Sequence, residues 1–135
     1  MFKLNGNSTY APVTLDDGNV TLTNGTDLVM MGWGATSCGG YIWEHSEQLI
    51  EVEVDYIPNQ VCQIKYQAGL SLGSITERML CAGNEGKAAY AGDSGGPIID
   101  KATGIQVGVY SWGFGCADAD HPDIYARVSD QYEWI

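Results

Sequence analysis

The chain has 135 residues, enough for one domain with its own core, and its 44% hydrophobic and 17% charged residues exclude a disordered polypeptide. Its 6 basic and 17 acidic residues give a net charge of −11, which argues against nucleic acid or an anionic membrane as a partner. No apolar run is long enough to span a membrane, and residues 1–4 do not have the pattern of a signal peptide.

Short apolar runs separated by turn signals predict six strands, at 28–31, 50–56, 79–82, 97–99, 107–112 and 124–128. The run 50–56 alternates apolar and acidic residues, which is typical of a strand with one face in the core and the other in water. One or two helical turns are predicted at 58–66, because Pro58 suits the start of a helix. Six antiparallel strands with short turns favour an all-β fold, a small Greek-key barrel.

The most informative motif is Gly92-Asp93-Ser94-Gly95-Gly96-Pro97. A glycine before the serine leaves its own amide unobstructed, so the N–H groups of Gly92 and Ser94 can point at one spot. Two such donors are the usual way to stabilise the oxyanion of an acyl-transfer intermediate. The motif therefore predicts a nucleophilic serine at position 94.

Only two histidines are available to serve as a general base, His45 and His121. The order Ser94, Asp118, His121 imitates that of the α/β-hydrolases, and the glycines on either side of Ser94 match their nucleophile elbow. That elbow requires a helix directly after the serine, whereas Gly95-Gly96-Pro97 and the following strand argue against one. We therefore interpret both histidines as solvated loop residues.

The remaining metal-ligating residue types do not form a recognisable site. Asp118, Asp120 and Asp123 do not make a calcium loop, since position five is Pro122 and no glycine stands at position six. The four cysteines fit no zinc spacing. We expect no metal and no cofactor.

The motif at 92–97 resembles the nucleophile motif of the trypsin/chymotrypsin-like serine proteases. Further segments resemble the C-terminal half of these proteases in the family's order: the Gly-Trp-Gly strand end at 31–34, the strand before the specificity pocket at 79–83, the substrate-pairing strand at 111–117, the back wall of the pocket at 122–128 and the start of the C-terminal helix at 132–135. The resemblance implies that residues 1–135 are the C-terminal barrel of the two-barrel fold, with a truncated C-terminal helix.

The resemblance also implies that part of the family's enzyme is absent. Residues 2–4 resemble the stretch just after the catalytic aspartate. The N-terminal barrel, its histidine, that aspartate and the amino terminus released on activation are therefore expected to lie outside this chain. Both ends fall inside motifs, so we expect the 135 residues to be an excised or incompletely predicted piece of a longer protein. Because a serine hydroxyl is a poor nucleophile without a base, we expect this piece to be inactive on its own.

Carried over residue by residue, the resemblance makes Ser94 the nucleophile and the amide of Gly92 an oxyanion donor. In the family, the carboxylate at Asp93 turns inward on activation and pairs with the freed amino terminus. Because that partner is absent and an unpaired buried carboxylate costs about 3–5 kcal/mol, we expect Asp93 to turn outward and the oxyanion site to collapse.

The resemblance assigns substrate binding to residues of the specificity pocket, namely Ala88, Ala89, Ser111, Trp112, Gly113, Gly115 and Asp123. Ala88 stands where trypsins have aspartate, whereas Asp123 stands where glycine is usual. Two readings stay open: the Asp123 carboxylate reaches the pocket floor and selects lysine or arginine, or it fills the pocket and blocks it. Gly113 and Gly115 carry no side chain and leave the entrance open.

The four cysteines match the family's disulfides only in part. The resemblance implies a disulfide between Cys62 and Cys81. A second family pair is replaced at both ends, by Leu28 and Asp100, and a third is broken because Tyr90 stands opposite Cys116. Cys38 and Cys116 are left, either as a substitute bridge or as free thiols or bonds outside this segment.

The first functional hypothesis is a secreted serine endopeptidase that forms an acyl-enzyme on Ser94 in the full-length protein. Its expected partners are a protein or peptide substrate, the missing N-terminal barrel of its own chain and protein inhibitors. Sequons at Asn7, Asn19 and Asn24 favour secretion. The alternative is a non-catalytic homologue acting as a binding or inhibitory module, which the unusual pocket residues favour. A third hypothesis is a truncated product that folds poorly, because its face between the barrels is exposed.

Overall fold

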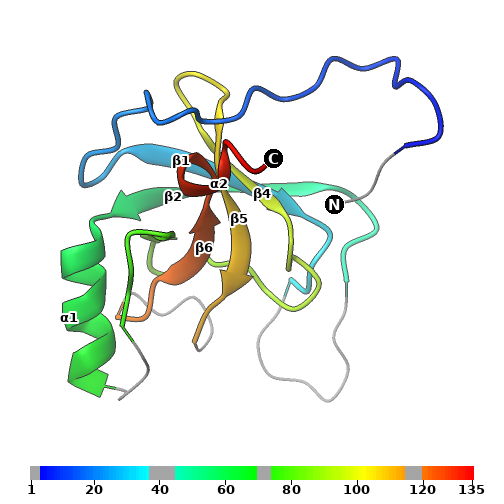
Figure 1. Ribbon diagram of the computed structural model, residues 1–135. Helices are drawn as coiled ribbons and strands as arrows, with labels where there is room; N and C mark the ends of the chain where they lie inside the picture. The colour runs from blue at the N-terminus through cyan, green and yellow to red at the C-terminus, as the bar shows by residue number, and fades with distance from the viewer. Residues whose placement is uncertain (1–3, 37–44, 70–73, 115–119) are drawn as a thin grey trace.

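The computed structural model describes residues 4–36, 45–69, 74–114 and 120–135. Six strands close into one antiparallel barrel in the order β1–β2–β3–β6–β5–β4 (Figure 1). The strands are β1 (Asp27–Gly32), β2 (Ile50–Ile57), β3 (Met79–Gly83), β4 (Pro97–Asp100), β5 (Gln106–Trp112) and β6 (Asp123–Arg127). The predicted all-β barrel is confirmed, and both ends of every predicted strand lie within one residue of the observed ends.

Two short helices accompany the barrel. α1 (Asn59–Gly69) begins directly after Pro58, as expected, and continues beyond the predicted end at residue 66. α2 (Val128–Gln131) follows β6 without a break, so the helix predicted to start at 132 begins one turn earlier. Val128 is buried and opens this helix instead of ending the preceding strand. Neither helix that the structure describes is long and apolar enough to cross a membrane.

The barrel core takes one or more fully buried side chains from each strand. These side chains include Leu28, Val54, Leu80, Ile98, Val107 and Tyr125. Burial of a large apolar side chain stabilises a fold by about 1.5–3 kcal/mol, so this cluster supplies much of the driving force for barrel formation.

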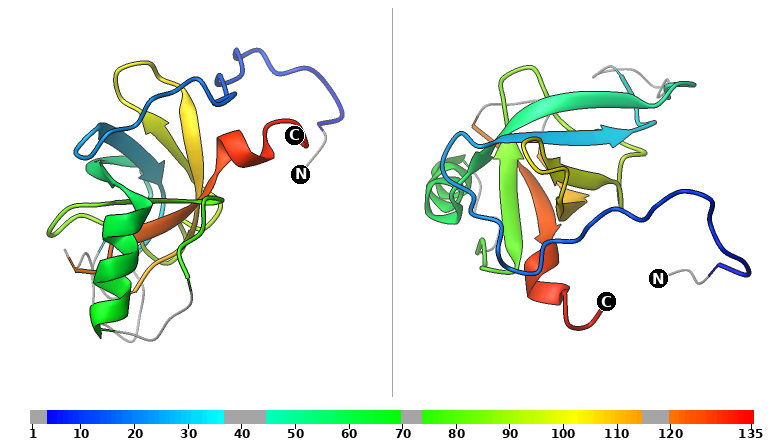
Figure 2. Two further views of the ribbon diagram at one scale, coloured as in Figure 1. Left: turned by 60° about the vertical axis from the view of Figure 1, so that its left-hand side comes forward. Right: turned by 90° about the horizontal axis from the view of Figure 1, so that it is seen from above.

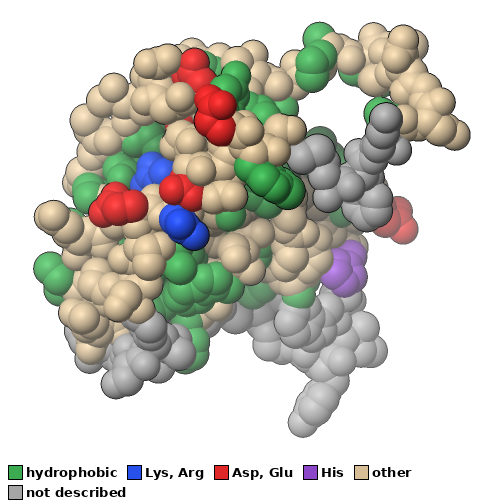
Figure 3. Space-filling view, viewed as in Figure 1, with side chains coloured by type: hydrophobic (Ala, Val, Ile, Leu, Met, Phe, Trp, Pro, Cys, Tyr) green, Lys and Arg blue, Asp and Glu red, His purple; other side chains and the backbone are tan. Residues whose placement is uncertain are grey.

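β2 follows the predicted alternation. Val54 and Tyr56 are buried in the core, whereas Glu51 and Glu53 face water. Outside the barrel, Glu53 lies 2.7 Å from the ammonium group of Lys101, and this contact lowers the pKa of the Glu53 carboxyl. Figure 3 likewise shows the few basic side chains of one face next to acidic ones. Exposed ion pairs of this kind contribute little to stability.

A second cluster joins α1 to the barrel. Cys62 of α1 and Cys81 of β3 form a disulfide, as the resemblance implied, and Tyr66 and Ile124 pack around it. A disulfide that closes a loop of this length contributes about 3 kcal/mol. α1 is therefore fixed to the strand that leads toward the candidate specificity pocket.

Leu28 and Asp100, the positions where the resemblance implied a lost disulfide, face each other across the pairing of β1 with β4. Both residues are buried. Asp100 accepts hydrogen bonds from the amide and the hydroxyl of Thr103, which stabilise the turn between β4 and β5. The seam between β1 and β4 is thus held by strand pairing and a capped turn.

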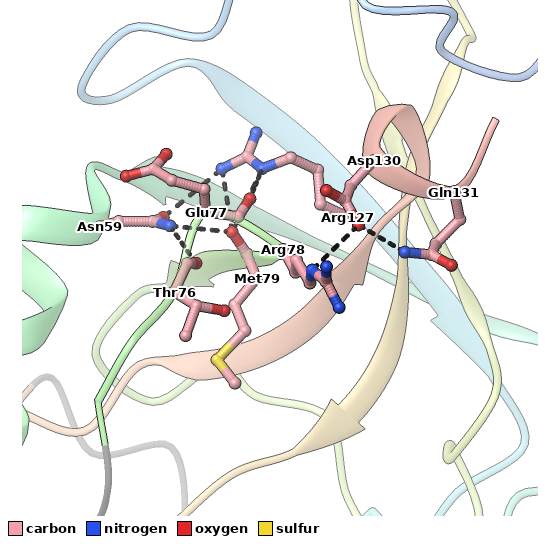
Figure 4. A network of polar contacts seen from close by, with 8 residues as sticks. All are labelled: Asn59, Thr76, Glu77, Arg78, Met79, Arg127, Asp130 and Gln131. Carbon is pink, nitrogen blue, oxygen red and sulfur yellow. Dashed lines mark hydrogen bonds and ion pairs between the residues drawn. The ribbon is translucent and has the colours of Figure 1, made fainter. Parts of the chain in front are cut away.

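Arg127, at the end of β6, connects three parts of the fold (Figure 4). Its guanidinium donates to the carbonyl of Met79 at 3.0 Å and to that of Glu77 at 2.9 Å. The side chain of Asn59, at the start of α1, donates to the same Met79 carbonyl and to that of Thr76. These shared acceptors hold α1, β3 and β6 in a fixed relation.

Residues 4–26 run along the outside of the barrel before β1 begins (Figure 2). The segment is attached at the start of β5, where the amide of Gln106 donates to the carbonyl of Thr14 and its carbonyl accepts the amide of Asp16. Asp16 is buried and accepts the amides of Gly18 and Val20. These bonds fix residues 14–20 at one end of the barrel.

Candidate active site

The 92–97 motif forms the turn that leads into β4. The amide of Gly95 donates to the carbonyl of Tyr110 on β5 at 3.0 Å, and the amide of Tyr110 donates to the carbonyl of Gly96 at 2.8 Å. β4 starts at Pro97, so a strand and not a helix follows Ser94. This geometry excludes a nucleophile elbow and holds the exposed Ser94 on a hydrogen-bonded support.

Two backbone amides of this turn, those of Gly92 and Ser94, have no acceptor among the residues that the structure describes. Gly92 and Gly95 have φ angles of 101° and 83°, which favour glycine. In the part of the chain that the structure describes, the amides of Gly92 and Ser94 donate to no other group, whereas that of Asp93 donates to the Tyr90 carbonyl at 2.9 Å. The two unengaged amides are therefore a candidate oxyanion site.

Asp93 points into the protein, so the expectation that it turns outward is wrong. Its side chain is 8% exposed, and its carboxylate accepts hydrogen bonds from the amides of Gly34 at 2.8 Å and Tyr90 at 2.9 Å. The expectation considered only the missing cationic partner. Hydrogen bonds from backbone amides also stabilise a buried carboxylate, and here they do so without that partner.

The glycines on either side of Trp33 make room for this carboxylate. A Cβ atom on Gly34 would lie 2.3 Å from Asp93 Oδ2, and one on Gly32 would lie 2.0 Å from Oδ1. In the sequence, these glycines indicated only a resemblance to the family. Their repetition was the signal that a buried group packs against this strand end.

A cavity of about 300 Å³ lies beside Asp93. Its lining is mostly apolar and includes Met30, Ile50, Val52 and Tyr90. The charged residues among the lining residues that the structure describes are one acid, Asp93, and one base, Lys87. The cavity therefore suits an apolar segment, and the Asp93 carboxylate lies in its wall.

A second cavity, of about 450 Å³, opens beside Ser94. It is lined by Met31, Trp33, Leu49 and the whole of the 92–97 motif. The side chains of Trp33 and Leu49 are 57% and 52% exposed. Large apolar side chains next to a candidate nucleophile mark a surface that another molecule or another part of the protein covers.

Asp123 is the second buried carboxylate of the region, with 5% of its surface exposed. Its Oδ2 accepts the amide of Ala89 at 2.7 Å, and a Cβ atom on Gly113 would lie 2.3 Å from its Oδ1. Burial raises the pKa of the Asp123 carboxyl to about 7, against the lowering effect of the Ala89 amide, and the charge of Asp93 raises it further. The carboxylate thus lies between the two predicted walls of the specificity pocket.

Three tyrosines surround these carboxylates. Burial raises the pKa values of the Tyr90, Tyr110 and Tyr125 hydroxyls, and the charge of Asp123 raises them further. The rings of Tyr110 and Tyr125 meet edge to face, with centroids 5.5 Å apart. All three hydroxyls therefore stay neutral at physiological pH.

The other predicted substrate-binding residues lie along the same region. Ala89 is buried and Ala88 partly buried, while Ser111 and Gly113 are exposed at and after the end of β5. The ring of Trp112 packs edge-on against Tyr66 of α1, with centroids 5.3 Å apart. Gly115 lies outside the described residues, as do Cys38, Cys116 and Asp118.

The two histidines occupy different environments. His121 is partly buried, and its ring contacts those of Tyr66 and Phe114, so its interpretation as a solvated residue is wrong. His45 is exposed, but its ring lies against Gly92. A Cβ atom added to Gly92 would lie only 2.7 Å from His45 Cε1. Within the described ranges, no three histidine, cysteine, aspartate or glutamate side chains cluster as metal ligands do.

The sequence of this chain is similar to those of known proteins. The family model described as Trypsin matches residues 2–135. A tryptase of Mus musculus is 42% identical over an alignment of 130 residues, and the match covers 92% of this chain and 47% of the tryptase. Trypsin 5G1 of Aedes aegypti is 41% identical over an alignment of 127 residues, and the match covers 93% of this chain and 45% of that protein.

Among solved structures, that of neuropsin, a serine protease expressed in the limbic system of mouse brain, matches with a TM-score of 0.77 and 28% identity. The match covers 92% of this chain and 52% of that one. The chain therefore spans about half the length of the relatives that it matches.

Proposed function

The chain belongs to the trypsin family of serine proteases, and from this premise we propose that it is the nucleophile-bearing half of a secreted serine endopeptidase. The observation that carries the proposal is the exposed Ser94 next to the buried Asp93, together with the amides of Gly92 and Ser94, which donate to no group among the described residues. A nucleophilic serine with oxyanion donors has no evident use other than catalysis. Ser94 and these amides therefore favour the enzyme over a non-catalytic homologue.

In the proposed reaction, Ser94 Oγ attacks the carbonyl carbon of the scissile peptide bond and gives its proton to a histidine. The amides of Gly92 and Ser94 donate to the oxyanion as it forms. The histidine then protonates the leaving amine, and the acyl-enzyme on Ser94 remains until water attacks it by the reverse sequence.

We propose that the histidine and its aspartate lie in a further part of the protein. The relatives are about twice as long as the matched region, and the apolar cavity lined by Trp33 and Leu49 lies next to Ser94. The second barrel of the family would cover this surface and place its histidine at Ser94. By themselves, the 135 residues are expected to be inactive.

The cavity beside Asp93 supports a role in activation. In the family, a newly released amino terminus pairs with the carboxylate at this position. Here the carboxylate already faces inward, and the cavity of about 300 Å³ next to it has a largely apolar lining. We propose that the cavity receives the new amino terminus and that Asp93 binds its ammonium group.

Asp123 supports specificity for lysine or arginine. It is buried, it accepts one amide, and no cation pairs with it among the described residues. A cationic substrate side chain would stabilise the ionised carboxylate and would lower its pKa. The competing reading, in which the Asp123 side chain blocks the pocket, predicts no binding of small cationic ligands such as benzamidine.

The test uses the full-length native protein, whose mass and amino-terminal sequence are determined first. A fluorophosphonate probe is expected to label Ser94 in the wild type and not in Ser94→Ala. The exposed Ser74 offers a matched control, since Ser74→Ala should label normally. A full-length protein that carries no upstream histidine, or that is not labelled, would contradict the enzyme and favour a binding module.

A further inference from the structure

Three Asn-x-Thr sequons lie in the first part of the chain, at Asn7, Asn19 and Asn24, and the proposed reaction uses none of them. All three asparagines are exposed. We propose that Asn19 and Asn24 carry N-linked oligosaccharides at the end of the barrel opposite Ser94. The position of both residues in the fold supports this assignment.

Asn24 lies at the end of β1 that is remote from the nucleophile. β1 begins at Asp27, whose carbonyl accepts the amide of Lys101, just beyond the end of β4. Its other end, at Gly32, touches Asp93. Since a strand rises about 3.3 Å per residue, β1 separates these two ends by roughly 17 Å.

Asn19 lies at the same remote end. It follows Asp16, which is hydrogen-bonded to Gln106 at the start of β5. β5 runs from there to Trp112, past Tyr110, whose carbonyl holds Gly95 next to Ser94. Seven residues of strand span about 20 Å, so an oligosaccharide at Asn19 projects away from the nucleophile.

Both side chains can carry a sugar without loss of the fold. Asn24 is exposed in a tight turn, where Gly25 has a φ of 80° and donates to the Tyr56 carbonyl. Asn24 makes no side-chain hydrogen bond within the described residues. Asn19 donates from Nδ2 to Asp17 at 3.0 Å, and the second N–H of that amide remains for the sugar.

The modification is a group transfer from a lipid-diphosphate oligosaccharide. Asn Nδ2 forms a bond to the anomeric carbon of the oligosaccharide. The bond between that carbon and the diphosphate oxygen breaks, the lipid diphosphate leaves with its electron pair, and the amide loses one proton. No further reactant is required.

The proposal does not extend to Asn7. That residue lies before Thr14, where the first backbone hydrogen bond from the segment to the barrel is found among the described residues. In the full-length protein its neighbours would be set by the second barrel. Asn19 and Asn24 instead belong to the part of the segment that the barrel itself fixes. The proposal rests on the proposed secretion and not on the proposed catalysis.

The test is made on the full-length protein secreted from eukaryotic cells. Peptide-N-glycosidase in heavy-oxygen water converts a glycosylated asparagine to labelled aspartate, which mass spectrometry locates. We expect the label at positions 19 and 24. On a gel, Asn19→Gln and Asn24→Gln should each lose one oligosaccharide, whereas Asn5→Gln, an exposed asparagine without a sequon, should lose none.

Unmodified Asn19 and Asn24 peptides from the secreted wild type would overturn the proposal, and this result does not depend on how any variant folds. Entry of the protein into the medium without either oligosaccharide would do the same. Labelling by the fluorophosphonate probe is measured on the same samples, so a loss of catalysis and a loss of modification are seen separately. The variant that combines Asn19→Gln with Asn24→Gln should react with the fluorophosphonate probe at the wild-type rate.

Discussion

The two buried carboxylates near Ser94 are held by consecutive backbone amides, Tyr90 for Asp93 and Ala89 for Asp123. Asp93 accepts a second amide, from Gly34, so each of its oxygens has a donor. Asp123 accepts one amide among the described residues, and burial raises its pKa to about 7. Backbone donors thus stabilise the buried Asp93 carboxylate before any cation binds to it, whereas Asp123 has a single amide donor among the described residues.

The largest expected effect is a pH dependence of the free energy of unfolding that comes from Asp123. Because its pKa is raised from 3.8 to about 7 on folding, the native state binds more protons than the unfolded state between these values. The free energy of unfolding should therefore fall as pH rises from about 4 to 7, by roughly 4 kcal/mol relative to Asp123→Asn. Urea unfolding of both proteins from pH 4 to 8 measures the difference, and parallel curves would contradict it.

A second change removes the hydrogen bond from the Gly34 amide to the Asp93 carboxylate. Gly34→Ala would place a Cβ atom 2.3 Å from the carboxylate and force it away from the Gly34 amide. We expect a loss of about 3 kcal/mol in the free energy of unfolding, together with loss of fluorophosphonate labelling. Gly6→Ala is the matched control, because a Cβ atom there meets nothing within 4 Å. Normal labelling of Gly34→Ala would show that Asp93 does not need this donor.

A third change displaces Asp123 while keeping its charge. Gly113→Ala would place a Cβ atom 2.3 Å from Asp123 Oδ1. We expect about 2 kcal/mol of destabilisation and weaker inhibition by benzamidine. Gly83→Ala, where the nearest atom would be 3.4 Å away, should change neither quantity. If benzamidine binds Gly113→Ala as tightly as the wild type, the ligand does not contact this carboxylate.

The smallest effect concerns the side chain of Tyr90, whose amide donates to Asp93. The Tyr90 hydroxyl is buried and has no hydrogen-bond partner among the described residues. Tyr90→Phe removes this unsatisfied group and should stabilise the protein by about 1 kcal/mol, with labelling unchanged. Thermal unfolding is a sufficient measurement. A loss of stability in the full-length protein would indicate that the second barrel supplies a partner.

The strands could be predicted from the sequence because their signals are local. The alternation at 50–56 fixed both the extent of β2 and the face that Val54 buries. The Cys62–Cys81 disulfide also followed from the family resemblance. These predictions depend on neighbouring residues or on a pairing that the family shares.

The orientation of Asp93 could not be predicted in the same way. Its donor at Gly34 is 59 residues away in the sequence, and only the closed barrel brings the two together. The environment of His121 depends on Tyr66 of α1, which is similarly remote in the sequence. The sequence shows that a cationic partner for Asp93 is missing, whereas the backbone amides that donate to its carboxylate become known only from the fold.

The pairing of Leu28 with Asp100 also has a consequence for how the molecule folds. This seam joins β1 to β4, two strands far apart in the sequence, and the Cys62–Cys81 disulfide between them shortens only part of the chain that must close. Contacts of long sequence separation form slowly, because the loop entropy is lost before the contacts stabilise the chain. We therefore expect closure of the β1–β4 seam to limit the folding rate, and reduction of the Cys62–Cys81 disulfide to slow it further.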